Sequence, residues 1–172
     1  GLGDVNTRQE LTQEVLAAAG MPAYEISNHA RPGEACRHNL VYWRCGDYTG
    51  IGPGAHGRLT LGGTRWALRQ HRAPEAWLAA VEGAGHATRE RRALPPTERL
   101  AETLMMGLRL AEGVPLARLR AAAGAAQNEM PLDPAALRRL VSGGFVSLDG
   151  ERLTATPAGR QRLDAVLAAL LA

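Results

Sequence analysis

The sequence contains no lysine: all 20 of its basic residues are arginines. This absence excludes a lysine nucleophile, a Schiff-base lysine and the lysine of a phosphate-binding loop. We attribute it to genomic base composition, since no chemistry would remove every surface lysine. The excess of positive charge is also small, because the formal net charge is +3 and is spread over residues 1–93 and 94–172. Neither part is a basic patch by composition, so no nucleic-acid partner is expected.

Cysteine is scarce as well, and long apolar runs are absent. Cys36 and Cys45 are too few for a disulfide framework and lack the C-x₂-C spacing of a metal site, so the reducing cytoplasm is the expected location. No run approaches the roughly 18 apolar residues of a membrane-spanning helix, and no signal-peptide pattern is visible. The first residues lead directly into a helix pattern, which fits either a natural start or a cut through a larger protein.

Aromatic residues make up only 4% of the chain, and six of the seven lie between Tyr24 and Trp77. The stretch from Tyr24 to His56 holds three of the five histidines, both cysteines and four of the aromatics, and it ends in a glycine-rich run. A packed core does not need this mixture of residue types. We therefore expect a functional site in this stretch, and two units of different character in the chain.

The N-terminal part alternates helix and strand patterns. A capping box from Thr7 to Glu10 predicts the start of a helix whose apolar stripe includes Leu11 and Val15. This stripe and the expected strand at 24–27 have too little chain around them to be covered on both sides. An unpaired strand edge invites association, so we expect self-association through this segment. The further expected elements are strands at 24–27, 48–51, 58–61 and 64–69, a helix at 75–82 and a polar linker at 85–94.

The C-terminal part carries clearer helix signals, namely capping residues, leucines at helical spacing and terminal glycines. Its Asp149-Gly150 pair predicts a tight hairpin turn. The expected elements are helices from Thr97, Pro115 and Asp133, a hairpin of 145–148 with 152–155, and a last helix from Thr156. Three helices, a hairpin and a helix form a winged-helix-like order, and the whole chain is expected to be α+β.

The block His38-Asn39-Leu40-Val41-Tyr42-Trp43 is the sharpest candidate for chemistry. An imidazole can ligate iron, a neighbouring asparagine can orient it, and aromatic rings offer flat faces to a macrocycle. The alternative is an ordinary core with a hydrogen-bonded histidine. If the block is extended, His38 and Tyr42 share a face about 13 Å apart; if it is helical, they lie about 6 Å apart, one turn on.

The other motifs carry weaker signals. The glycine-rich run Gly50–Gly57 could admit a ligand close to the backbone, but Pro53 interrupts it, and a tight bend explains it equally well. Arg138 and Arg139 lie where a winged helix would contact DNA, yet acidic neighbours favour a solvated face. Cys36 and Cys45 are expected to be inert thiols, and we assign no role to His71 or His86.

Taken together, two blocks resemble a known family. YEISNHARPGEACRHNLVYWR followed by DYTGIGPGAHG closely resembles the radical-SAM haem chaperones of the HemW type, relatives of the oxygen-independent coproporphyrinogen III oxidase HemN. The dense match covers about residues 24–58. From Leu94 onward the chain resembles the small helical C-terminal domain of that family.

This resemblance implies roles for individual residues. His38, Asn39, Tyr42 and Trp43 match the family's H-N-x-x-Y-W motif, which implies haem binding with His38 as a ligand of the haem iron. Ala55 and His56 would lie near S-adenosylmethionine in the intact parent protein. The implied partners are haem, a haem-accepting protein, the N-terminal half of the barrel and, for the parent, a peripheral membrane contact.

The chain also departs from the family. The C-x₃-C-x₂-C motif that holds a [4Fe–4S] cluster is absent, and Cys36 and Cys45, separated by eight residues, cannot replace it. Most of the partial (βα) barrel is absent as well. The chain therefore resembles the C-terminal part of such a protein, and by itself it is not expected to be an enzyme.

The resulting domain prediction has three ranges. Residues 1–70 are expected to be the end of the partial barrel with added short strands, 71–93 a connecting helix and linker, and 94–172 the small winged-helix-like domain. The expected function is haem binding and transfer, or tetrapyrrole metabolism, within a HemW-like protein. The alternative is a winged-helix interaction or DNA-binding module.

Overall fold

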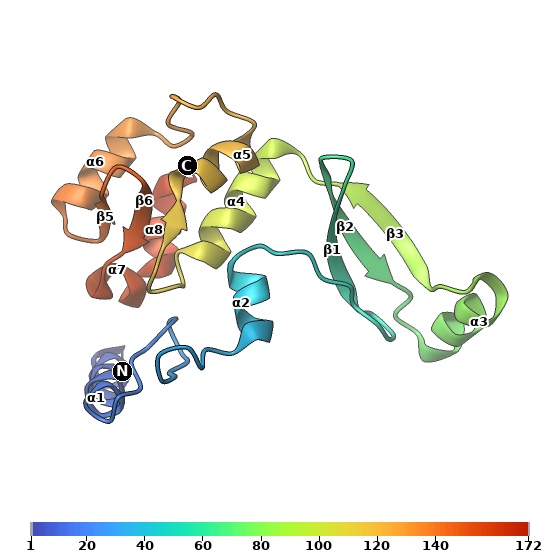
Figure 1. The fold of residues 1–172 in the computed structure, drawn as a ribbon, viewed down its shortest axis with the longest axis horizontal. Coiled ribbons are helices and arrows are strands. Elements are labelled where there is room, and N and C mark those ends of the chain that lie inside the picture. The colour runs from blue at the N-terminus through green and yellow to red at the C-terminus, as the bar shows by residue number, and fades with distance from the viewer. Residues whose placement is uncertain (1, 172) are drawn as a thin grey trace. The chain divides into compact units, whose positions relative to one another are not determined.

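The computed structural model describes residues 2–171, and side chains from residue 7 onward. The chain folds into two compact units, one made of residues 1–45 and 100–172 and the other of residues 46–99. Both contain helices and antiparallel strands (Figure 1). The α+β class is therefore confirmed, while the predicted domain ranges 1–70, 71–93 and 94–172 stay a prediction.

The first unit is built around a small sheet with the strand order β4-β6-β5. Its antiparallel register pairs Val114 with Leu153 and Val146 with Ala155. The strands are β4 (Val114–Pro115), β5 (Val146–Leu148) and β6 (Arg152–Ala155). The helices from residue 96 onward are α4 (Pro96–Gly107), α5 (Leu116–Ala123), α6 (Pro134–Ser142), α7 (Pro157–Gln161) and α8 (Leu163–Leu170).

Caps and leucine spacing explain these elements. The Asp133 carboxylate accepts hydrogen bonds from the amides of Ala135 and Ala136, and the Thr156 hydroxyl accepts one from the amide of Gly159. Proline occupies the first turn of both helices, where its missing N–H costs nothing. The apolar faces then meet in one core, which includes Leu104, Leu108, Val114, Leu116, Leu119, Leu137, Val146, Leu153, Val166 and Leu170.

The N-terminal residues of this unit differ from the prediction in two places. Helix α1 (Leu2–Ala18) runs through Thr7, so the capping box does not mark its start. The predicted strand 24–27 is wrong: two isolated bridges, Ala23 to His29 and Glu25 to Leu110, stand in its place. A short loop then leads into α2 (Arg37–Trp43), which settles the His38–Trp43 block as helical.

The second unit is a three-stranded antiparallel meander, β1-β2-β3, with a helix between its last two strands. Its elements are β1 (His56–Leu61), β2 (Thr64–Gln70), α3 (Pro74–Ala84) and β3 (Thr88–Ala93). Gly62 and Gly63 both have positive φ and form the predicted hairpin turn. The predicted linker 85–94 is wrong, because most of it is β3. The predicted strand 48–51 is reduced to one bridge, Tyr48 to Arg58.

Candidate functional site

Helix α2 sorts the side chains of the His38–Trp43 block onto two faces. The rings of His38 and Tyr42 are four residues apart and touch edge to face, with centroids 4.8 Å apart and planes at 88°. His38 is exposed and Tyr42 half-buried. The exposed imidazole therefore stands beside an aromatic ring on a surface that another molecule can reach.

The other face of α2 packs into the first unit. The Asn39 amide donates a hydrogen bond to the Tyr24 hydroxyl at 3.2 Å. The Arg109 guanidinium lies over the ring of Trp43, 4.6 Å from its centroid, in a cation–π contact. Asn39 and Trp43 thus position the helix, whereas His38 and Tyr42 face outward. The role of Arg109 could not be predicted from the sequence, because no local pattern links it to Trp43, which lies far upstream.

Arg109 also lies near the buried carboxyl group of Glu25, in the loop before α2. Glu25 is 1% exposed, and its Oε2 lies 3.8 Å from Nη2 of Arg109. Its Oε1 accepts hydrogen bonds from the Ser27 amide at 2.9 Å and from the Asn28 side chain at 2.6 Å. A buried charge is tolerated only with such partners, so this cluster fixes the loop that precedes α2.

An ion pair anchors the C-terminal end of α2. The Arg44 guanidinium donates two hydrogen bonds to the Glu112 carboxylate, each at 2.9 Å, and Arg118 donates one to the Arg44 carbonyl at 3.0 Å. The Arg44 hydrogen bond lowers the pKa of Glu112 below its ordinary value, and Glu112 raises the pKa of Arg44. The position of Arg44 directly after the motif was the only sequence signal for this anchor.

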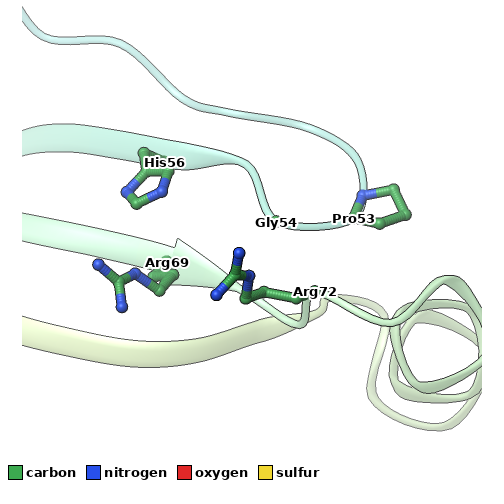
Figure 2. A pocket seen from close by; sticks show the side chains of 5 residues that line it. All are labelled: Pro53, Gly54, His56, Arg69 and Arg72. Atoms are coloured by element: carbon green, nitrogen blue, oxygen red, sulfur yellow. The ribbon is translucent and has the colours of Figure 1, made fainter.

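The predicted residues Ala55 and His56 belong to the second unit. His56 opens β1 and lines a pocket of about 430 Å³ together with Pro53, Gly54, Arg69 and Arg72 (Figure 2). The loop before it is tied internally, since the Gly54 amide donates to His71 and the Ala55 amide to Gly52. These two amides are therefore not offered to a phosphate.

Neither cysteine belongs to a metal-ligand cluster. Cys36 precedes α2 and is exposed, while Cys45 follows it and its thiol lies 3.7 Å from the Glu102 carbonyl oxygen. In the described part of the chain, no three or more His, Cys, Asp or Glu side chains are grouped closely enough to hold a metal ion. These residues do not fit the thiolate set of a [4Fe–4S] cluster.

Hydropathy gives one further observation. Among residues 2–171, no helix combines the length and the apolar content that a membrane crossing requires.

Comparison with known proteins gives consistent results. The HemN C-terminal domain family matches residues 94–162. The heme chaperone HemW of Mycobacterium tuberculosis (strain CDC 1551 / Oshkosh) is 38% identical over 95% of this chain, and HemW of Escherichia coli (strain K12) is 32% identical over 95%. The mouse mitochondrial protein named radical S-adenosyl methionine domain-containing protein 1 is 47% identical over 64% of this chain.

A solved structure shares the fold. The chain superposes on HemN from Escherichia coli, described as a coproporphyrinogen III oxidase and a radical SAM enzyme, with a TM-score of 0.63 over 93% of this chain and 16% identity. The chain spans 38% of the Mycobacterium tuberculosis relative, 41% of the Escherichia coli HemW and 39% of the HemN structure. The resemblance to HemW and HemN that the motifs of residues 24–58 indicated is thereby confirmed, and residues 94–162 match the HemN C-terminal domain family.

Proposed function

We propose that this chain is the haem-handling and docking part of a HemW-like radical-SAM protein, which binds haem transiently and passes it to an acceptor protein. The observation that carries the proposal is the face of α2 where the exposed His38 imidazole meets the Tyr42 ring at 4.8 Å. HemW relatives that share 38% and 32% of their aligned residues with this chain bear the name heme chaperone. Haem is cargo here, to be held and released.

The roles of the four motif residues follow from their positions. His38 supplies a nitrogen to the haem iron, because a neutral imidazole is a common iron ligand and this one is exposed. Tyr42 packs its ring against the macrocycle. Asn39 and Trp43 hold α2 in place through Tyr24 and Arg109. A chaperone must release its cargo, so we expect weak to moderate affinity.

The radical chemistry of the parent protein belongs to another part of it. The [4Fe–4S] cluster and S-adenosylmethionine are proposed for the intact parent on the strength of its radical-SAM relatives. The described cysteines do not fit the cluster, so no step of this proposal runs through it. We still predict that Ala55 and His56 lie near S-adenosylmethionine in the parent protein. We also propose that the parent works in the cytoplasm.

The finer architecture is part of the same proposal. Residues 1–70 would complete a partial (βα) barrel, and the helices and hairpin of residues 94–172 would form a winged-helix-like docking domain. Arg138 and Arg139 on α6 are exposed, but the Asp133 carboxylate caps the same helix. We therefore propose a protein partner for this domain and no nucleic acid.

Haemin titration of this chain, followed by the shift of the Soret band, tests the proposal. His38→Ala should weaken binding about tenfold or more, since it removes the iron ligand. His86→Ala removes an exposed imidazole outside the motif and should bind haemin like the unaltered chain. Equal binding by the unaltered chain and both variants would show that the motif is only structural here.

A further inference from the structure

One row of side chains crosses the sheet of the second unit. His56 of β1 pairs with Arg69 of β2, which pairs with Glu90 of β3, so these three residues lie on one face. Arg72, just beyond β2, extends the row. Figure 2 shows the His56 ring and the Arg69 and Arg72 side chains gathered beside the Pro53-Gly54 loop.

Positive charge prevails in this pocket. The Oε2 atom of Glu90 lies 4.0 Å from Nη1 of Arg69, and both side chains are half exposed. An ion pair of that length and exposure is weak. Arg72 has no ion pair within residues 2–171. The next row across the face adds Arg58 and Arg92, and the Glu98 carboxylate forms an ion pair with Arg92 at 2.8 Å.

The pocket is shaped before any ligand arrives. The amide of Gly54 donates to the His71 carbonyl at 2.7 Å, and the Gln70 amide donates to Ala55 at 2.9 Å. Gly54 has φ +73°, and a Cβ there would lie 3.8 Å from the Arg72 side chain. A Cβ at that distance would fit, so it is the positive φ that favours glycine in this turn. The two hydrogen bonds join the loop to the end of β2 and so fix the backbone of the residues that line the pocket.

We propose that His56, Arg69 and Arg72 form a binding site for a small oxyanion, a carboxylate or phosphate group of a ligand. Guanidinium groups are suited to such groups because they donate paired, charge-assisted hydrogen bonds. The site lies in the second unit and does not depend on haem binding at α2.

The two oxyanions can be tested separately with inorganic phosphate and succinate. Titration of the chain with each, followed by the ³¹P linewidth of phosphate and the ¹³C shift of labelled succinate, gives the affinity for each group. Arg69→Gln and Arg72→Gln should each weaken binding of the preferred anion about fivefold or more. Arg89→Gln, an equal loss of charge on β3 outside the pocket, should leave it unchanged.

A second measurement needs no variant. Saturating anion should shift the ring resonances of His56 and leave those of His86 in place. The proposal is overturned if Arg89→Gln weakens binding as much as Arg72→Gln does, since that would indicate unspecific surface charge. The proposal is also overturned if neither anion shifts the ring resonances of His56.

Discussion

Gly159, in α7, packs directly against the backbone of Phe145, the residue before β5. A Cβ built on Gly159 would overlap the carbonyl oxygen of Phe145, which also accepts a hydrogen bond from the Thr156 amide. Neither backbone can retreat without breaking that bond. We therefore expect Gly159→Ala to destabilise the first unit by about 2–4 kcal/mol in urea unfolding followed by circular dichroism.

Gly83 in α3 is the matched control, because it is also helical and a Cβ there meets nothing within 4 Å. Gly83→Ala should be neutral or should raise the stability by up to about 1 kcal/mol, as alanine favours a helix. If both variants unfold at the same urea concentration as the unaltered chain, the result would contradict the close packing of α7 against Phe145.

The ion pair of Arg44 and Glu112 predicts a pH dependence. The hydrogen bond from Arg44 lowers the pKa of Glu112 from its ordinary value of 4.5. A carboxyl whose pKa is lower in the folded state stabilises the fold above pH 4.5, and the contribution disappears as the pH falls through the folded value. Since both side chains are nearly half exposed, we expect only about 0.2–1 kcal/mol.

Glu112→Gln should accordingly be less stable than the unaltered chain at pH 7, and the difference should shrink below pH 4.5. Thermal unfolding at a series of pH values measures this difference in stability between Glu112→Gln and the unaltered chain. Glu14→Gln on α1, which removes a carboxylate with no ion pair among the described residues, provides the comparison. A difference for Glu112→Gln that is constant from pH 7 to pH 3 would contradict the lowered pKa.

At the scale of elements, the helices of residues 96–170 were predictable because their capping residues and leucine spacing agree. The hairpin around Asp149-Gly150 was predictable for the same reason. The last helix was expected to be continuous, but it divides into α7 and α8 at Arg162, whose φ and ψ of −123° and 31° interrupt it. No residue type in that segment signals the break.

Strand β3 shows why other elements escaped prediction. Its sequence Thr88–Ala93 is polar except for Ala93, and five of its six residues are exposed. No alternation of apolar and polar residues could appear, because both faces of this strand meet solvent or arginine side chains. Arg91, for example, covers the ring of Trp66 at 4.1 Å. Such a strand forms through its pairing with β2, which a local pattern does not reveal.

The candidate site was predictable in its residues and not in its geometry. The His38–Trp43 block stood out by composition, yet helix and strand remained open because its six residues satisfy neither period clearly. The contacts that decide for the helix come from Tyr24, Arg109 and Glu112. Two of these three lie more than 60 residues downstream of the block, beyond the reach of spacing arguments.

For the whole molecule, the outer face of α1 predicts self-association. Leu11 is 60% exposed and Val15 58%, and the two residues are four apart on the same face. Burying such a stripe against a second surface is favourable. We expect the chain to form dimers or larger species at micromolar concentration, and the double substitution of Leu11→Glu with Val15→Glu to shift it toward the monomer in light scattering.

Leu78 on α3 is also half exposed, at 51%, and Leu78→Glu serves as the control. It should leave the mass distribution unchanged, because it lies outside the α1 stripe. A strictly monomeric unaltered chain, or equal dissociation by Leu78→Glu, would contradict a role for α1.

The anchoring of α2 sets an order of events during synthesis of the chain. A helix of seven residues is too short to persist alone in water, and its holding partners Arg109, Glu112 and Arg118 follow it by more than 60 residues. The ribosome must therefore release these residues before the His38 and Tyr42 face can take its shape. Under the proposed function, a nascent chain that still lacks them would present no assembled face to haem, so loading would begin only after residues through Arg118 have emerged.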